Sequence, residues 1–280
     1  MKNLLSKLTL LSLATVLLVG CGGGNNQAPA NNEPSENTGN TNQAAAEAPE
    51  DLEDRTYIMG LDDTFAPMGF RDESGEIVGF DVDLAQDAAK RMGIDLDLQP
   101  IDWAMKEAEL DAGNIDFIWN GYSVTPERAE KVDLSEPYLE NSQIIIVMAD
   151  SDVKTKADLA GKTVTLQAES SALDALNADE EFRASLGADP VEYATNVECF
   201  KDLEAGRSDA MVADGVLARY YIKQNGEENY RILEEDLGKE EYAVGIKKGN
   251  TALLEALNQA LADQKADGTY DEIYSKWFSE

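Results

Sequence analysis

Apolar positions after Arg55 follow two alternating periods, one typical of buried strands and one typical of amphipathic helices. Residues 57–61 form a short apolar run that predicts a strand, and residues 81–92 carry apolar side chains every three or four positions, which predicts a helix. Gly93 follows this helix directly, as helix-ending glycines do. Residues 94–98 then alternate apolar with acidic side chains, the pattern of a half-buried strand.

The same alternation continues to the end of the chain. We predict further strands over 115–119, 144–148, 162–167, 191–194 and 210–213, and helices over 103–112, 171–177, 196–205, 215–224, 251–267 and 270–278. Strands that alternate with helices indicate α/β sheets with crossover helices. In such folds ligands bind beyond the carboxyl ends of strands, where the strand order reverses, so the loops that follow the strands are the places to search.

The start of the chain has a different composition and predicts export. Residues 1–20 begin with two lysines and continue into an apolar stretch that is too short to span a membrane, the form of a signal peptide. Cys21 follows a small residue, which resembles a bacterial lipoprotein site and implies a lipid on the Cys21 sulfur as the only membrane contact. The alternative is an ordinary secretory signal followed by a chance cysteine. Residues 21–51 lack aromatic, valine, isoleucine and leucine residues, so they predict a flexible linker.

Charge and residue usage exclude several classes of function. The first 50 residues hold four acidic and two basic side chains, so the remainder carries 51 acids against 21 bases. Such a surface repels phosphate backbones, which argues against nucleic acid as a partner. The chain contains no histidine, the commonest general base and metal ligand, and we expect no catalytic residue, metal or cofactor. Cys199 lies in a helical apolar pattern that predicts a buried, inert thiol.

Polar side chains gather in the loops that follow four of the predicted strands. Asp62 follows the first strand, and Asp214 follows the strand at 210–213. Thr125 can cap a helix that begins with proline, which would fix the direction in which Arg128 projects. Residues 168–171 open a helix whose free N–H groups favour a carboxylate. Together these loops offer groups of both charges, which suits a zwitterionic ligand.

Seven motifs occur in a fixed order between Arg55 and Phe278. They are Phe65-Ala66-Pro67-Met68-Gly69-Phe70, Val78-Gly79-Phe80-Asp81-Val82-Asp83-Leu84, Thr125-Pro126-Glu127-Arg128, Asp133-Leu134-Ser135-Glu136-Pro137-Tyr138, Gly206-Arg207-Ser208-Asp209-Ala210, Gly268-Thr269-Tyr270 and Ile273-Tyr274-Ser275-Lys276-Trp277-Phe278. Each is weak alone. In this order they closely resemble extracellular solute-binding protein family 3, the polar amino-acid family that serves ATP-driven importers.

This resemblance implies a fold and a function. The implied fold is a two-lobed, periplasmic-binding-protein-like α/β fold of type II, with two doubly wound sheets joined by a two-crossing hinge. Lobe 1 would comprise 52–146 plus 243–280, and lobe 2 would comprise 147–242. The implied function is capture of a polar L-amino acid outside the cytoplasm by a lipid-anchored monomer. The ligand would then pass to an ABC permease with its ATPase subunits.

The resemblance also implies how the amino-acid head group is bound. Arg128 would bind the α-carboxylate through two parallel hydrogen bonds, helped by the backbone N–H groups of Ser123 and Ser171. Asp214 would accept the α-ammonium, together with the Gly121 carbonyl and the Ser123 hydroxyl.

Other matching positions would surround the ligand's side chain. Phe65 and Trp103 would enclose it, and Asn120, a variable position, would tune the pocket. Asp62 would lie at the far end and favour a cationic amino acid or cystine, while glutamine remains possible. Gln167 stands where some relatives have lysine, so an acidic ligand side chain is disfavoured. Asp62 could instead only cap a turn.

Purely structural interpretations stand beside these roles. Arg128 could be an exposed helix charge, Asp214 a helix cap and Phe65 part of the core. Trp119, inside a strand, is expected in the core. Glu169 stands where the family has a small residue, often glycine, and we expect its carboxylate to point outward. The alternative function is a dehydratase-like exported enzyme on this scaffold, with Glu169 as its acid or base.

Overall fold

A computed structural model of the chain describes residues 52–279, so the predicted signal peptide, Cys21 and the linker lie outside the described residues. The strands are β1 (Thr56–Leu61), β2 (Thr64–Phe65), β3 (Gly69–Arg71), β4 (Ile77–Val78), β5 (Asp95–Pro100), β6 (Phe117–Ser123), β7 (Val132–Leu134), β8 (Leu139–Met148), β9 (Val164–Gln167), β10 (Val191–Tyr193), β11 (Ala210–Asp214) and β12 (Tyr230–Lys247). The α-helices are α1 (Phe80–Met92), α2 (Lys106–Ala112), α3 (Pro126–Lys131), α4 (Ser171–Ala178), α5 (Glu180–Ser185), α6 (Asn196–Glu204), α7 (Gly215–Asn225), α8 (Thr251–Asp267) and α9 (Thr269–Phe278).

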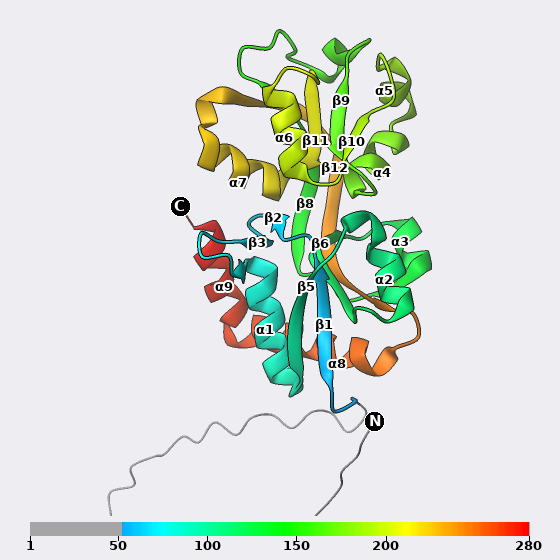
Figure 1. Cartoon of the computed structure of the whole chain (residues 1–280), viewed down its shortest axis with the longest axis vertical. Coiled ribbons are helices and arrows are strands. Elements are labelled where there is room, and N and C mark those ends of the chain that lie inside the picture. The colour runs from blue at the N-terminus through cyan, green and yellow to red at the C-terminus, as the bar shows by residue number, and fades with distance from the viewer. Residues whose placement is uncertain (1–51, 280) are drawn as a thin grey trace, which may run out of the picture. The chain divides into compact units, whose positions relative to one another are not determined.

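Two groups of parallel strands are joined by a pair of long antiparallel strands. The main sheet runs in the order β10-β9-β11-β8-β12-β6-β1-β5, with β7 paired to β12. Strands β5, β1 and β6 are parallel to one another, as are β10, β9 and β11, whereas β8 and β12 run antiparallel to their neighbours. We call the parts around these two parallel groups lobe 1 and lobe 2. Figure 1 shows β8 and β12 passing from one lobe to the other.

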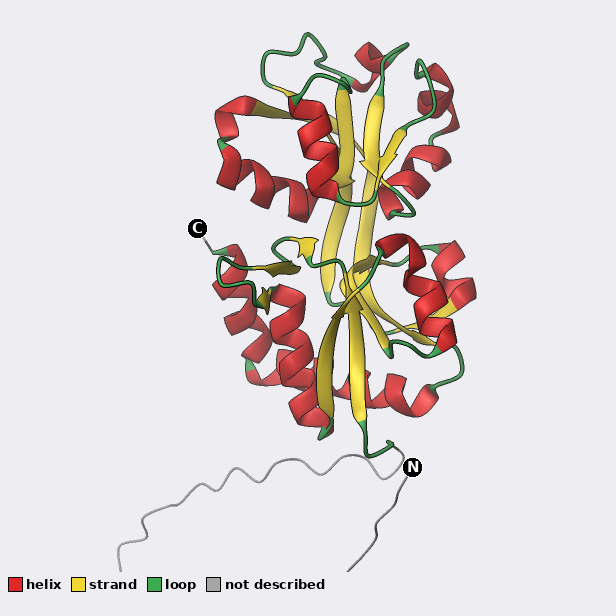
Figure 2. Cartoon of the chain, in the orientation of Figure 1, coloured by secondary structure: helices red, strands yellow, loops and turns green. Residues whose placement is uncertain are grey.

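Helices cover both sides of each strand group, as Figure 2 shows. This arrangement confirms the predicted α/β fold class, although hydrogen bonding through β8 and β12 joins the two expected sheets into one path. The expected lobe boundaries at 146/147 and 242/243 fall inside these two crossing strands. Within residues 52–279, no helix combines the length and the apolar character that crossing a bilayer requires.

Most predicted elements are present, with shifted ends. Strand β6 continues through Ser123, so the expected loop after residue 119 is part of a strand whose seven residues are all buried. The helix predicted over 103–112 is divided into a 3-10 turn (Trp103–Met105) and α2, which ends at Gly113 as expected. Strand β12 was not predicted, because its charged middle carries no apolar alternation.

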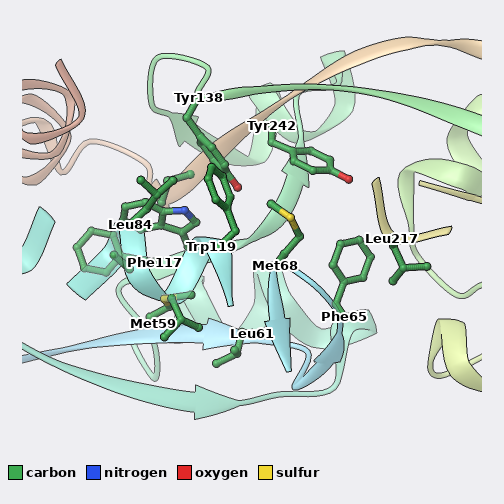
Figure 3. Close-up of a cluster of buried hydrophobic side chains, with 14 of the residues drawn as sticks. Met59, Leu61, Phe65, Met68, Leu84, Phe117, Trp119, Tyr138, Leu217 and Tyr242 are labelled. Atoms are coloured by element: carbon green, nitrogen blue, oxygen red, sulfur yellow. The ribbon is translucent and has the colours of Figure 1, made fainter. Parts of the chain in front are cut away.

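The core of lobe 1 contains the aromatic side chain that the sequence placed there. Trp119 is 1% exposed and meets the Phe117 ring edge-on, with 6.4 Å between ring centroids (Figure 3). The expectation that Trp119 lies in the core is therefore confirmed.

Cys199 is likewise buried, and burial raises the pKa of its thiol to about 12. The thiol stays protonated at neutral pH, as the interpretation of an inert cysteine requires.

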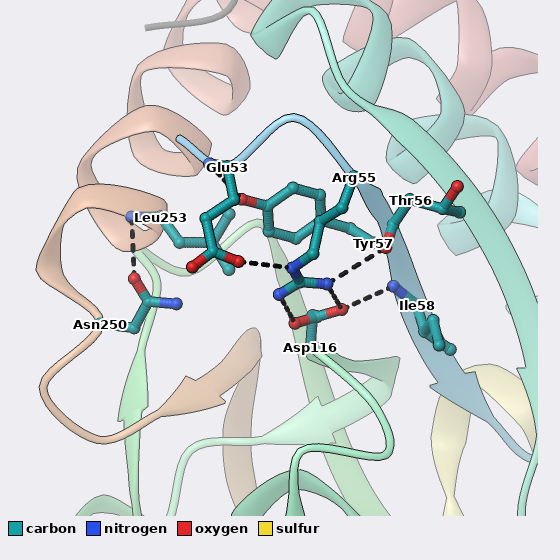
Figure 4. Close-up of polar contacts among 8 residues, drawn as sticks. All are labelled: Glu53, Arg55, Thr56, Tyr57, Ile58, Asp116, Asn250 and Leu253. Carbon is teal, nitrogen blue, oxygen red and sulfur yellow. Dashed lines mark hydrogen bonds and ion pairs between the residues drawn. The ribbon is translucent and has the colours of Figure 1, made fainter. Parts of the chain in front are cut away.

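A forked ion pair fixes the start of lobe 1. The Arg55 guanidinium donates to both carboxylate oxygens of Asp116, at 2.9 and 2.6 Å (Figure 4). The same Asp116 carboxylate accepts the backbone N–H of Ile58 at 2.8 Å. Because Asp116 directly precedes β6, these bonds tie β1 to its parallel neighbour and set where both strands begin, at the end of lobe 1 away from lobe 2.

Candidate functional site

The loops at the carboxyl ends of the strands meet between the two lobes. The side-chain amide of Gln167 in lobe 2 donates to Asp62 in lobe 1 at 2.9 Å. The hydroxyl oxygens of Ser123 and Ser171 lie 3.0 Å apart, again across the cleft. The structure thus brings four of the predicted site residues into two direct contacts between the lobes.

Asp62 is buried at this edge of lobe 1, and both of its carboxylate oxygens accept hydrogen bonds. Its Oδ1 accepts the backbone N–H and the hydroxyl of Thr64, at 2.9 and 2.7 Å, and its Oδ2 accepts the Gln167 amide. Asp62 therefore does cap a turn, as the structural interpretation held, but only with one oxygen. Burial raises the pKa of this carboxyl. In residues 52–279 no basic side chain lies within ion-pair distance of Asp62.

Three predicted site residues lie on β6 rather than in a loop, because the strand is longer than expected. Gly121 has φ 59°, and a Cβ at this position would lie 2.8 Å from the Phe65 ring, so only glycine fits without strain. Its N–H donates to the buried Asp81 carboxylate at 2.7 Å. Asn120 accepts the backbone N–H of Asp62 at 3.1 Å, while its Nδ2 has no partner among the described residues. The third residue, Ser123, is fully buried.

Arg128 is buried at the start of α3. The Thr125 hydroxyl accepts the Arg128 backbone N–H at 3.1 Å, which confirms the predicted cap. Arg128 is only 4% exposed, so the alternative of a solvated helix charge is wrong. The guanidinium donates to the Ser123 carbonyl at 3.0 Å and lies 4.4 Å from the centre of the Tyr122 ring. Within residues 52–279 it forms no ion pair with any carboxylate.

Asp214 is the last residue of β11 and is also buried. Its side chain makes no capping bond to α7, so the interpretation as a helix cap is wrong. Its Oδ1 instead accepts from Asn141, Gln143 and the Tyr242 hydroxyl, at 2.5, 3.1 and 2.7 Å. Burial, and then the negative charge of Glu240, raise the pKa of Asp214 to about 7.

Glu240 shares its hydrogen-bond donors with Asp214. The Asn141 amide donates to Glu240 Oε1 at 2.7 Å, and the Gln143 amide donates to the same oxygen at 2.5 Å. Two amides on β8 therefore hold two carboxylates against each other. Carboxylates this close disfavour full ionisation unless a cation joins them.

The two predicted aromatic residues are both buried and packed against other side chains. Phe65 is 5% exposed and belongs to the main apolar cluster, where Figure 3 shows it near Met68 and Tyr242. Trp103 is 6% exposed and meets the Tyr122 ring edge-on, at 6.2 Å between ring centroids. The core interpretation of Phe65 is therefore correct as far as packing goes, and its position beside Gly121 is also compatible with contact to a ligand.

The N-terminus of α4 faces the same region from lobe 2. Ser170, at the N-cap, makes no side-chain bond to the first turn, because its hydroxyl donates to the Gln167 carbonyl at 2.7 Å. The first N–H groups of α4, including that of Ser171, therefore receive no side-chain cap. A helix N-terminus of this kind attracts a carboxylate.

Glu169 is a departure from the family pattern, and its backbone conformation is one that suits the glycine often found there. Its φ is 52°, a left-handed conformation that glycine adopts without strain, and its side chain is exposed, as expected. An exposed carboxylate lacks the burial that usually tunes a catalytic acid, which weighs against the enzyme alternative.

Sequence reasoning missed five residues of the site. Lys106 lies within the helix predicted over 103–112 and was not predicted as a site residue, yet its side chain is only 2% exposed. Asn141 and Gln143 precede the strand as predicted, and Glu240 and Tyr242 lie in the unpredicted β12. A polar residue at an otherwise buried helical position was the signal for Lys106, whereas the others had none, because a strand with charged residues was not recognised.

Two open grooves flank the crossing strands and reach the site. One, of about 700 Å³, is lined by Asn141, Gly215 and Glu240 among others. The other, of about 580 Å³, is lined by Gln143, Ser171 and Glu240 among others. Both grooves lie beside the pair of carboxylates formed by Asp214 and Glu240 rather than between them. Solvent can therefore reach this pair from either side.

The arrangement has a clear polarity. A buried arginine and an uncapped helix N-terminus lie at one end, and Asp62 and Asp214 provide buried carboxylates elsewhere. Such a cleft can bind a small zwitterion. Fold and site together define a two-lobed α/β protein of the ligand-binding class.

Comparison with known proteins identifies the family. The model for bacterial extracellular solute-binding proteins, family 3, matches residues 57–280, and the chain belongs to this family. The L-cystine-binding protein TcyJ of Escherichia coli (strain K12) is 32% identical over 226 residues, covering 80% of this chain and 82% of that protein. The ABC transporter glutamine-binding protein GlnH of Bacillus subtilis (strain 168) is 30% identical over 285 residues, covering 100% and 98%.

Solved structures agree with this assignment. An ABC uptake transporter substrate-binding protein from Streptococcus pneumoniae with bound histidine superposes with a TM-score of 0.78 at 39% identity, covering 80% of this chain and 93% of that one. An ancestral amino-acid-binding protein, described as a precursor of cyclohexadienyl dehydratase, superposes with a TM-score of 0.72 at 34% identity, covering 80% and 96%.

Proposed function

We propose that this protein captures a polar L-amino acid between lobe 1 (52–146 plus 243–280) and lobe 2 (147–242) and delivers it to an ABC permease. Arg128, with Ser123 and Ser171, binds the α-carboxylate. Asp214, with Gly121 and Ser123, accepts the α-ammonium. Relatives that bind cystine, glutamine and histidine support a ligand with this head group.

One observation carries the proposal. Arg128 and Asp214 are 4% and 5% exposed, and within residues 52–279 neither forms an ion pair with a side chain of opposite charge. A buried charge without a partner is costly, so proteins keep one where a ligand supplies the partner. An amino acid carries both of the complementary charges on one carbon atom.

The side-chain end of the site favours a cationic amino acid or cystine, with glutamine also possible. Asp62 presents a buried carboxylate there, and its neighbour Gln167 is neutral. Among residues 52–279 no basic side chain lies within ion-pair distance of Asp62, which disfavours an acidic ligand side chain at this end. Phe65 and Trp103 enclose an unbranched stem or a planar group, and Asn120 has an unpartnered amide that can contact it. A lipid on Cys21 would hold the protein at the outer face of the cell membrane as a monomer.

The test is a screen of the free amino acids, ornithine and cystine by thermal shift, followed by calorimetry on Arg128→Ala and Asp214→Ala. Removing one member of a buried charge pair typically costs about 2–5 kcal/mol, or about thirtyfold to several-thousandfold in affinity. The exposed Lys131→Ala is the control and should bind as the parent does, since Lys131 and its partner Glu127 are both exposed to solvent. Parent-like binding by either site variant would show that the head group is bound elsewhere.

A dehydratase-like enzyme is the second candidate, because a similar scaffold, an ancestral amino-acid-binding protein, is described as the precursor of a dehydratase. Incubation with prephenate-like acids distinguishes the two functions. Turnover would support the enzyme, whereas saturation at one ligand per protein without a product supports the binding protein.

A further inference from the structure

A lysine that the proposed function does not use is buried where the two lobes meet. Lys106, at the start of α2 in lobe 1, is 2% exposed. Its ammonium donates to the backbone carbonyl of Glu169 in lobe 2 at 2.9 Å. Within its own lobe it lies 3.2 Å from the Glu107 carboxylate and 5.3 Å from the centre of the Trp103 ring. The contact to Glu169 exists only while the lobes are together.

The surroundings of Lys106 contain a second cation. Burial and, next in size, the positive charge of Arg128 lower the pKa of Lys106 to about 8. The acidic groups that face this pair are Glu107 on α2, Glu127 on α3, Glu169 in the β9–α4 loop and Asp174 on α4. Both cations belong to lobe 1, and closure covers them with lobe 2. Removing water from around two neighbouring cations is unfavourable, and a carboxylate beside them offsets that cost.

We propose that Lys106 is a positioning residue that couples closure of the lobes to the ligand's carboxylate. In an empty cleft its charge beside Arg128 opposes closure. When a carboxylate lies against Arg128, the repulsion is screened and the bond from Lys106 to the Glu169 carbonyl holds the lobes together. This rests on the proposed function, because it requires an anionic group at Arg128.

The left-handed backbone at Glu169 fits this role. Its φ of 52° turns the carbonyl of the β9–α4 loop toward lobe 1, directly before the helix N-terminus that faces the ligand. The bond from Lys106 therefore fixes the loop that presents α4. The acceptor is the backbone carbonyl of Glu169, so this hydrogen bond does not depend on the side chain at position 169.

The experiment compares Lys106→Met with the parent by stopped-flow binding of the best ligand and by single-molecule FRET between the lobes. Methionine keeps the length of the stem and removes the charge. Release should become about tenfold faster or more, with the association rate little changed, since a hydrogen bond to a charged group is lost. The closed fraction should fall with ligand but not without it.

The controls separate this role from mere packing and from the proposed function. Lys131→Met, an exposed lysine paired with Glu127, should release ligand at the parent's rate. A release rate for Lys106→Met within twofold of the parent overturns the role of Lys106, as does an equal fall of the closed fraction with and without ligand. A parent protein that no amino acid saturates overturns the proposed function instead.

Discussion

Acidification should weaken ligand binding through Asp214, the proposed acceptor of the ammonium group. Burial and the neighbouring Glu240 raise the pKa of Asp214 to about 7, so below that pH the empty site holds a proton that the ligand must displace. At about pH 5, two units lower, about one carboxyl in a hundred is ionised. The dissociation constant should then be about a hundredfold higher than at about pH 8, which corresponds to about 2.7 kcal/mol.

Isothermal titration calorimetry from about pH 8 to about pH 5 measures this effect. Arginine or glutamine is the suitable ligand, since neither side chain titrates in that range. Repeating each titration in buffers of different ionisation enthalpy counts the protons released, which should approach one per ligand near pH 5. Glu240→Gln removes the nearby negative charge, so its affinity loss should begin at lower pH. A flat affinity profile in the parent, or an unshifted profile in the variant, would refute the reasoning.

Three further predictions follow from buried carboxyls and from the N-terminal cysteine. Asp62→Asn should weaken the binding free energy of a cationic ligand or cystine by more than about 1.4 kcal/mol beyond the loss for glutamine. Equal losses by calorimetry would show that Asp62 does not distinguish side chains. Burial raises the pKa of Asp81 to about 7, so the folded protein keeps a proton that the unfolded chain loses, and stability falls as pH rises from about 4 to about 7. Asp81→Asn should flatten that part of the curve in denaturant unfolding, because one amide oxygen can still accept from Gly121 and Tyr138; an unchanged slope contradicts the assignment. Cys21→Ser should move the protein from the membrane fraction to the soluble fraction with ligand affinity unchanged, and continued membrane retention would remove the lipoprotein interpretation.

The position of Arg128, which we propose binds the ligand's carboxylate, could be predicted because it lies in a short motif. Thr125 caps α3 as its sequence indicated, and Arg128 follows at a fixed spacing, so its direction was set locally. Asp214 was predicted from its place after a strand, and only the end of that strand was misplaced. Local chemistry thus determined most of the candidate site.

Long-range features could not be predicted in the same way. Strand β12 is charged through its middle, and only pairing with β8 defines that middle part as a strand. The hydrogen-bond partner of Lys106 is a carbonyl 63 positions away in the other lobe, which no local pattern encodes. Glu240 joins Asp214 for the same reason, since β8 and β12 meet only in the folded chain.

The position of Glu240, Asn141 and Gln143 on the two crossing strands has a consequence for engineering. The groups that tune Asp214 are part of the connection about which the lobes would move. A substitution there would change both the movement of the lobes and the proposed binding of the ligand's ammonium group. Asp62 and Gln167 lie off the crossing strands, so changing them leaves the connection intact and alters only the bond that they make between the lobes. A designer of an optical biosensor should therefore change ligand preference at those two positions and leave the crossing strands as they are.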